Sequence, residues 1–111
     1  MPGRFQVVLQ TPEGERTIDC ADDEFIWDAA ARSGIVLPAI CHQGRCLTCA
    51  ARLIAGEVDQ SAAASYFDQD RAAGFALLCT ARPKSNLVLQ THQQWEMREF
   101  RRSLGLPAPY G

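Results

Sequence analysis

Three cysteines stand within nine residues of this chain, and they constrain its fold more than any other feature. Four residues separate Cys41 from Cys46, two separate Cys46 from Cys49, and Cys79 follows after 29 more. A loop that carries three thiolates can surround most of a small metal centre, and a fourth thiolate must then come from a segment packed beside it. The chain therefore has to bring together two segments that are distant in sequence.

Length and composition limit the chemistry that these thiols perform. The chain has 111 residues, enough for one domain, and 11 basic against 13 acidic residues give a formal net charge of −2. This balance does not indicate a nucleic-acid partner, and no apolar run approaches the ~20 residues of a membrane span. The amino-terminal segment also lacks the pattern of a signal or transit peptide. We therefore expect a reducing compartment, where the five cysteines indicate metal or redox chemistry rather than disulfides.

The complete cysteine spacing is typical of sites that hold a 2Fe–2S cluster. Two irons bridged by two sulfides need four thiolates around a compact core, and nearby hydrogen-bond donors tune the reduction potential. Gly44 permits a tight turn of the loop, and Thr48 supplies a hydroxyl close to a sulfur. Arg45 adds a cation that would raise the potential.

The segment before the cysteine loop predicts a β-hairpin followed by a helix. Residues 4–11 and 16–21 are rich in β-formers and flank a turn. Residues 22–34 have the pattern of a helix that Asp22 or Asp23 caps and Gly34 ends. Its buried stripe would consist of Ile26, Ala29 and Ala30.

The segment after the loop predicts two strands and two helices. A strand precedes the turn at Gly56, and another covers residues 86–92. A short helix capped by Ser65 is expected over residues 65–74, and a longer one over residues 93–105. The longer helix would bury Met97, Phe100 and Leu104 on one face. Short strands mixed with short helices predict an α+β fold around one mixed sheet.

Over residues 5–92 the chain resembles the plant-type 2Fe–2S ferredoxins of cyanobacteria and chloroplasts. The resemblance rests on the stretches "CADDEFIWDAA", "LPAICHQGRCLTCA", "GEVDQS", "GFALLCTARP" and "LQTH". It implies a β-grasp (ubiquitin-like) fold, a mixed sheet crossed by one helix with the cluster near one surface. It also implies a ferredoxin domain over residues 1–92 and, as in minor ferredoxins with a tail, an added C-terminal helix within an extension over 93–111. By position, the resemblance implies that one 2Fe–2S cluster is held by Cys41, Cys46, Cys49 and Cys79.

Other interpretations of these residues remain open. Four thiolates also suit a structural zinc, although zinc sites usually pair their cysteines and Cys79 has no neighbouring partner. Cys20, the fifth cysteine, is best interpreted as a small core residue. His42 and His92 are not needed as ligands beside four well-spaced cysteines.

The resemblance implies a one-electron carrier and not an enzyme. It would use a single low-potential cluster to pass electrons from a reductant, such as photosystem I or a reductase, to an acceptor enzyme. A cluster-bearing redox-sensing or assembly module is the alternative, and a ferredoxin subunit of an oxygenase or reductase system shares the same cysteine pattern. The expected partners are redox proteins, with no nucleic acid and no membrane span, and the chain is expected to be a monomer. The expected location is the cytoplasm of a prokaryote such as a cyanobacterium, or the plastid stroma as a mature form.

The departures from the family concern charge. Photosynthetic ferredoxins are strongly acidic. In this chain Gln94 and Trp95 stand at positions where the family has acidic residues. The chain keeps acids near both predicted central helices and adds five arginines, Arg45, Arg71, Arg98, Arg101 and Arg102. These changes lead to the hypothesis of an acceptor other than ferredoxin–NADP reductase, with Tyr66 and Phe67 at the centre of a different docking patch.

Overall fold

The computed structural model describes residues 3–38, 47–63 and 66–106 of the chain. Cys41, His42, Gly44, Arg45 and Cys46 lie outside the described residues, and so does Ser65. No helix of the described part is long and apolar enough to cross a bilayer.

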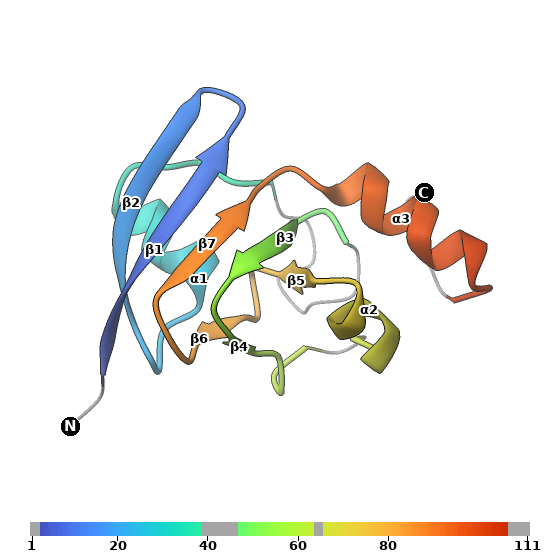
Figure 1. The fold of residues 1–111 in the computed structure, drawn as a ribbon. Coiled ribbons are helices and arrows are strands. Elements are labelled where there is room, and N and C mark those ends of the chain that lie inside the picture. The colour runs from blue at the N-terminus through green and yellow to red at the C-terminus, as the bar shows by residue number, and fades with distance from the viewer. Residues whose placement is uncertain (1–2, 39–46, 64–65, 107–111) are drawn as a thin grey trace.

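A five-stranded mixed sheet forms the centre of the molecule (Figure 1). Its strands lie in the order β2 (Gly14–Ala21), β1 (Arg4–Thr11), β7 (Leu87–Gln90), β3 (Ala50–Ala55) and β5 (Phe75–Leu77). β1 and β7 run parallel, and the other neighbouring pairs run antiparallel. A second, two-stranded sheet joins β4 (Val58–Asp59) to β6 (Arg82–Pro83). The predicted α+β class with a mixed sheet is confirmed.

Helix α1 (Ile26–Arg32) packs against this sheet. The predicted stripe of Ile26, Ala29 and Ala30 is fully buried in a core shared with β1, β2 and β7. The predicted cap was wrong, because Phe25 occupies the N-cap position. Asp22 instead accepts a hydrogen bond from the Gly3 N–H at 2.9 Å, so its carboxylate holds the start of β1.

Helix α2 (Asp68–Ala72) is shorter than predicted. It begins after Phe67, whose backbone N–H donates to Asp70 Oδ2 at 2.9 Å. The N-cap of α2 is therefore Phe67 and not the predicted Ser65, and the carboxylate of Asp70 satisfies the N-cap backbone donor.

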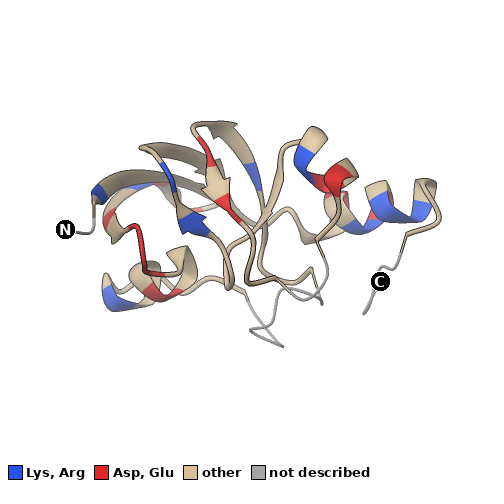
Figure 2. Cartoon of the chain, turned by 90° about the horizontal axis from the view of Figure 1, so that it is seen from below, with Lys and Arg blue, Asp and Glu red and all other residues tan. Residues whose placement is uncertain are grey.

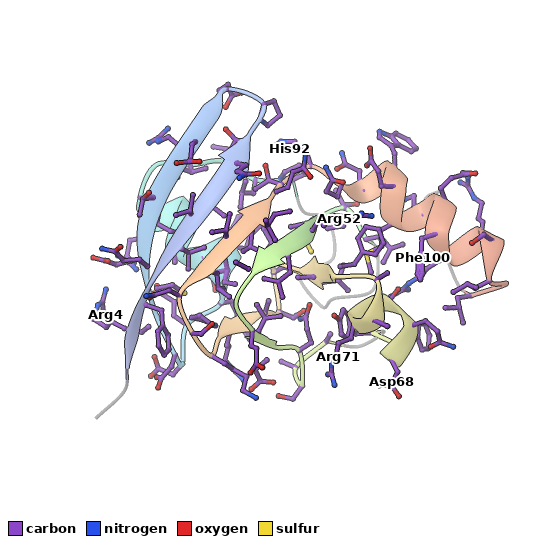
Figure 3. All side chains as sticks on the ribbon, viewed as in Figure 1. Arg4, Arg52, Asp68, Arg71, His92 and Phe100 are labelled. Carbon is purple, nitrogen blue, oxygen red and sulfur yellow. The ribbon has the colours of Figure 1, made fainter. Side chains whose placement is uncertain are left out.

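Helix α3 (Gln94–Ser103) confirms the added C-terminal helix, and it lies at the end of the molecule away from the β1–β2 hairpin (Figure 1). Met97 is fully buried. Phe100, labelled on α3 in Figure 3, has its ring 5.4 Å from the Phe75 ring of β5. The prediction was wrong for the third residue of the stripe, Leu104, which is 51% exposed. Arg101 is fully buried instead. The boundary drawn at residue 92 stays a prediction, since α3 shares a core with β5.

Candidate iron–sulfur site

The antiparallel pair β3–β5 brings Cys49 and Cys79 together. Ala50 pairs with Leu77 in the register of the two strands, and the Leu78 N–H donates to the Cys49 carbonyl at 3.2 Å. Cys49 thus precedes β3 and Cys79 follows β5 at the same end of the pair. Two cysteines that 29 residues separate in the sequence are therefore adjacent in the fold.

The sulfurs of Cys49 and Cys79 lie in direct contact in the interior. Cys49 Sγ lies 3.0 Å from Cys79 Sγ, and the two residues are 3% and 5% exposed. The separation is well above the ~2.04 Å of a disulfide bond. A 2Fe–2S cluster requires four thiolate donors, and two buried, adjacent thiols are the kind of donor that it needs. The described residues therefore fit half of such a site.

An apolar wall surrounds this thiol pair. Leu47, Phe75, Leu77 and Met97 are all at most 2% exposed and pack in one cluster with both cysteines. This wall excludes water from the protein side of the thiols, and solvent exposure is one of the factors that set a cluster's potential. Met97 comes from α3, so the C-terminal helix is part of the site's packing.

Gln60 holds the strand that leads to Cys79. Its side-chain Oε1 accepts from the Leu77 N–H at 2.6 Å, and its Nε2 donates to the Leu77 carbonyl at 3.4 Å. β5 is an edge strand, so no neighbouring strand bonds its outer side. Gln60 is 4% exposed, and its two buried bonds take the place of those missing strand–strand bonds. The sequence carried no signal for this role beyond the amide itself.

The ends of the cysteine loop are tied to the fold on both sides. Trp27 of α1 donates from Nε1 to the Leu37 carbonyl at 2.8 Å, shortly before the loop. On the other side Leu47 has φ of +66°, a left-handed conformation, and its carbonyl accepts from the Ala50 N–H at 3.1 Å. The buried Leu47 side chain helps to hold this otherwise unfavourable backbone.

Two arginines on α3 pack into the domain instead of facing solvent. Arg98 is 4% exposed, and its Nη2 donates to Thr48 Oγ1 at 3.2 Å. Arg101 binds both carboxylate oxygens of Asp70, at 3.2 and 2.7 Å, and its guanidinium lies 4.9 Å from the centre of the Phe67 ring. Sequence reasoning missed both roles because it treated the arginines as surface charges.

Cys20 has no part in the thiol pair. It is fully buried among the β1–α1 core residues, as predicted, and its Sγ lies 3.4 Å from the Glu24 carbonyl. Burial, with a smaller contribution from the nearby Glu24 carboxylate, raises the pKa of its thiol to about 12. His92 lies near the start of α3, with its Nδ1 2.7 Å from Thr91 Oγ1.

Comparison with known proteins identifies this arrangement. Residues 10–84, which contain all four cysteines of the motif, match the model of the 2Fe-2S iron-sulfur cluster binding domain. The chain belongs to the plant-type 2Fe–2S ferredoxin family. It is 42% identical to the heterocyst ferredoxin of Microchaete diplosiphon over 82% of this chain and 92% of that one. It is 40% identical to chloroplastic ferredoxin-6 of Zea mays over 83% of this chain and 60% of that one. Its cofactor is therefore one 2Fe–2S cluster, and its function is electron transport rather than catalysis.

The ferredoxin fold also occurs in longer proteins. Pectocin M2 matches with a TM-score of 0.77 at 28% identity, over 93% of this chain and 40% of that one. The Amycolatopsis cytochrome P450 reductase GcoB matches with a TM-score of 0.71 at 33% identity, over 79% of this chain and 26% of that one. The chain thus spans less than half of each of these two structures. The match to pectocin M2 includes more of this chain than the family model does.

Proposed function

We propose that this ferredoxin carries one electron at a time on a low-potential 2Fe–2S cluster whose ligands are Cys41, Cys46, Cys49 and Cys79. The observation that supports this assignment most directly is the buried contact of 3.0 Å between Cys49 Sγ and Cys79 Sγ. The other two cysteines stand at the family's spacing in the loop that ends beside Cys49.

The chain's own residues hold and insulate the redox centre. The cluster supplies reversible one-electron chemistry when bound, and no bond to a substrate forms or breaks. Leu47, Leu77 and Met97 exclude water from the thiols of Cys49 and Cys79. Gln60 keeps β5, and hence the approach to Cys79, in position.

Metal analysis tests the ligand assignment. Protein purified without oxygen is expected to contain about two irons and two labile sulfides per chain and to show a visible charge-transfer spectrum. Cys79→Ser should disturb or abolish that spectrum, whereas Cys20→Ser should keep it, because Cys20 lies in a separate core. A colourless protein with one zinc per chain would contradict the assignment. Reduction that always destroys the cluster would favour the redox-sensing or assembly alternative.

The donor is proposed to be a reductase or photosystem I, and the acceptor an enzyme other than ferredoxin–NADP reductase. Docking of carriers is brief and is steered by charge complementarity. Figure 2 shows charges of both signs at each end of the molecule, near β2 and α1 at one end and on α2 and α3 at the other. Asp22, Asp23 and Asp28 are exposed at the first end and offer acidic charge to a basic partner, although the exposed Arg4 and Arg32 lie in the same region.

The structure changes which charges can contribute to docking. Arg98, Arg101 and Asp70 are buried, so the charges of these two helices that face solvent are those of Asp68, Arg71, Glu96, Glu99 and Arg102. Tyr66 and Phe67 are partly buried, and the Tyr66 hydroxyl donates to the Phe75 carbonyl at 2.6 Å, which makes them a weaker docking centre than expected. Reductase-coupled electron transfer should be measured against ionic strength beside an acidic family member. Equal rates with an equally steep salt dependence would refute the change of acceptor.

We also propose that the carrier works as a monomer, in a prokaryotic cytoplasm or in the plastid stroma. The relatives from cyanobacteria and from a chloroplast support this range of locations. Sedimentation equilibrium of the cluster-loaded protein should give the mass of one chain, 12.2 kDa plus the cluster. A concentration-independent dimer mass would contradict the proposal.

A further inference from the structure

The C-terminal helix places a buried positive charge beside the cysteine loop. Arg98 lies one residue after Met97, which is fully buried against Cys49 and Cys79. Its Nη2 donates to the hydroxyl of Thr48, the residue directly before Cys49. The side chain is thus anchored at the peptide segment that leads into one of the proposed ligands.

Several contacts fix Arg98 in this position. Its guanidinium carbon lies 5.1 Å from the centre of the Trp95 ring, on the same helix. One turn further along α3, Arg101 is locked to Asp70 of α2 by two hydrogen bonds. Because the helix is held on both sides of Arg98 by buried groups, the guanidinium is held in place and does not have to order when a partner docks.

A charge in this environment acts more strongly than one on the surface. Arg98 is 4% exposed, so water and salt screen it much less than they screen an exposed arginine. A 2Fe–2S core with four thiolates carries a formal charge of −2 when oxidised and −3 when reduced. A nearby fixed cation therefore stabilises the reduced form more than the oxidised form.

We propose that Arg98, on the C-terminal helix, raises the reduction potential of the cluster through its positive charge. The inference rests on the proposed ligation by Cys49 and Cys79. It assigns the extension a direct effect on electron transfer, in addition to its packing. The electron enters and leaves the cluster, and Arg98 remains a cation throughout.

Arg98→Gln is the primary test, because glutamine keeps a polar side chain at this position but carries no charge. The midpoint potential of the cluster-loaded protein is expected to fall by about 59 mV, which corresponds to a tenfold weaker equilibrium constant for one-electron reduction. Arg98→Lys should restore most of this loss. If Arg98→Gln does not assemble a cluster, Arg98→Met keeps the apolar length of the side chain and serves in its place.

Arg102→Gln is the matched control, on the same helix and with the same change of charge. Arg102 is exposed and pairs with Glu99 at 3.3 Å, so its loss should leave the potential almost unchanged. Thr48→Val removes the hydroxyl contact but keeps the charge, and it should lower the potential less than Arg98→Gln does. The proposal is overturned if the neutral Arg98 variant and Arg102→Gln have the same midpoint potential. Failure of the ligand assignment would look different, because the unsubstituted protein would then hold no 2Fe–2S cluster.

Discussion

Arg101 and Asp70 form an ion pair with no solvent exposure of either side chain, between the C-terminal helix and the short helix α2. The closest distance, from Arg101 Nη2 to Asp70 Oδ2, is 2.7 Å, and Asp70 also accepts from the Phe67 N–H. Removing one partner of such a pair leaves an uncompensated buried charge. The pair therefore couples the extension to the rest of the domain.

The first prediction concerns this coupling. Asp70→Ala and Arg101→Met should each lower the free energy of unfolding by roughly 3–5 kcal/mol, because each leaves a buried charge unpaired. The double variant should lose clearly less than the sum of the two single losses. Denaturant melts of the double-mutant cycle measure this, with the exposed pair of Arg102 and Glu99 as the control, for which at most ~1 kcal/mol is expected. Additive losses at Asp70 and Arg101 would contradict the prediction.

The second prediction concerns removal of the extension after His92. The truncated chain loses Met97, whose burial alone contributes about 2 kcal/mol, together with the Phe75–Phe100 contact. Thermal stability should fall and an iron chelator should remove the cluster faster, while the spectrum of the intact cluster stays the same. A chain that ends at Gly105 keeps all of α3 and should behave like the full chain. Identical melting of the chain cut after His92 and the full chain would instead give the extension a role in partner binding.

The third prediction concerns Gln60. Gln60→Leu leaves the buried N–H of Leu77 without its partner, at a cost of about 1–3 kcal/mol, whereas the Leu77 carbonyl keeps its bonds from Thr80. Thermal denaturation should show this loss, and the cluster should be released faster because β5 leads to Cys79. Gln69→Leu makes the same substitution at an exposed position of α2 and should change little. Equal melting temperatures of the two variants would show that the Gln60 bonds contribute nothing.

The fourth prediction concerns the thiol of Cys20. Its pKa of about 12 leaves on the order of 1 in 10,000 molecules ionised at pH 8, and only the thiolate reacts readily. The cluster-loaded, folded protein should therefore show no titratable thiol with a disulfide reagent at pH 8, and the denatured protein, after removal of iron and sulfide, should show five. A thiol that reacts in the folded protein and disappears in Cys20→Ala would contradict this.

The same pKa shift predicts a dependence of stability on alkaline pH. The ordinary pKa of the thiol is 9.0, and the fold raises it, so the fold favours the neutral form. Its contribution to stability is complete below pH 9 and is lost as the pH rises toward about 12. Cys20→Ala should show a shallower alkaline loss of stability than the unsubstituted protein in denaturant melts from pH 8 to pH 10.5.

The sequence alone determined the features that depend on local spacing. The cysteine motif predicted the cofactor, because the number and spacing of thiolates follow from the cluster's own chemistry. The stripe of Ile26, Ala29 and Ala30 predicted the buried face of α1, because the period of a helix places those residues on one side. The hairpin strands β1 and β2 followed from β-forming residues around a turn.

Only the tertiary structure decided how α3 is buried. A hydrophobic pattern places leucine inside and arginine outside, yet Leu104 is exposed and Arg101 is fully buried. An arginine can enter the interior only where a carboxylate and other polar atoms compensate its charge, and Asp70 lies 31 residues earlier in the chain. Arg98 likewise depends on Thr48, which lies 50 residues earlier. Such pairings depend on where distant segments meet, and no local period in the sequence records that.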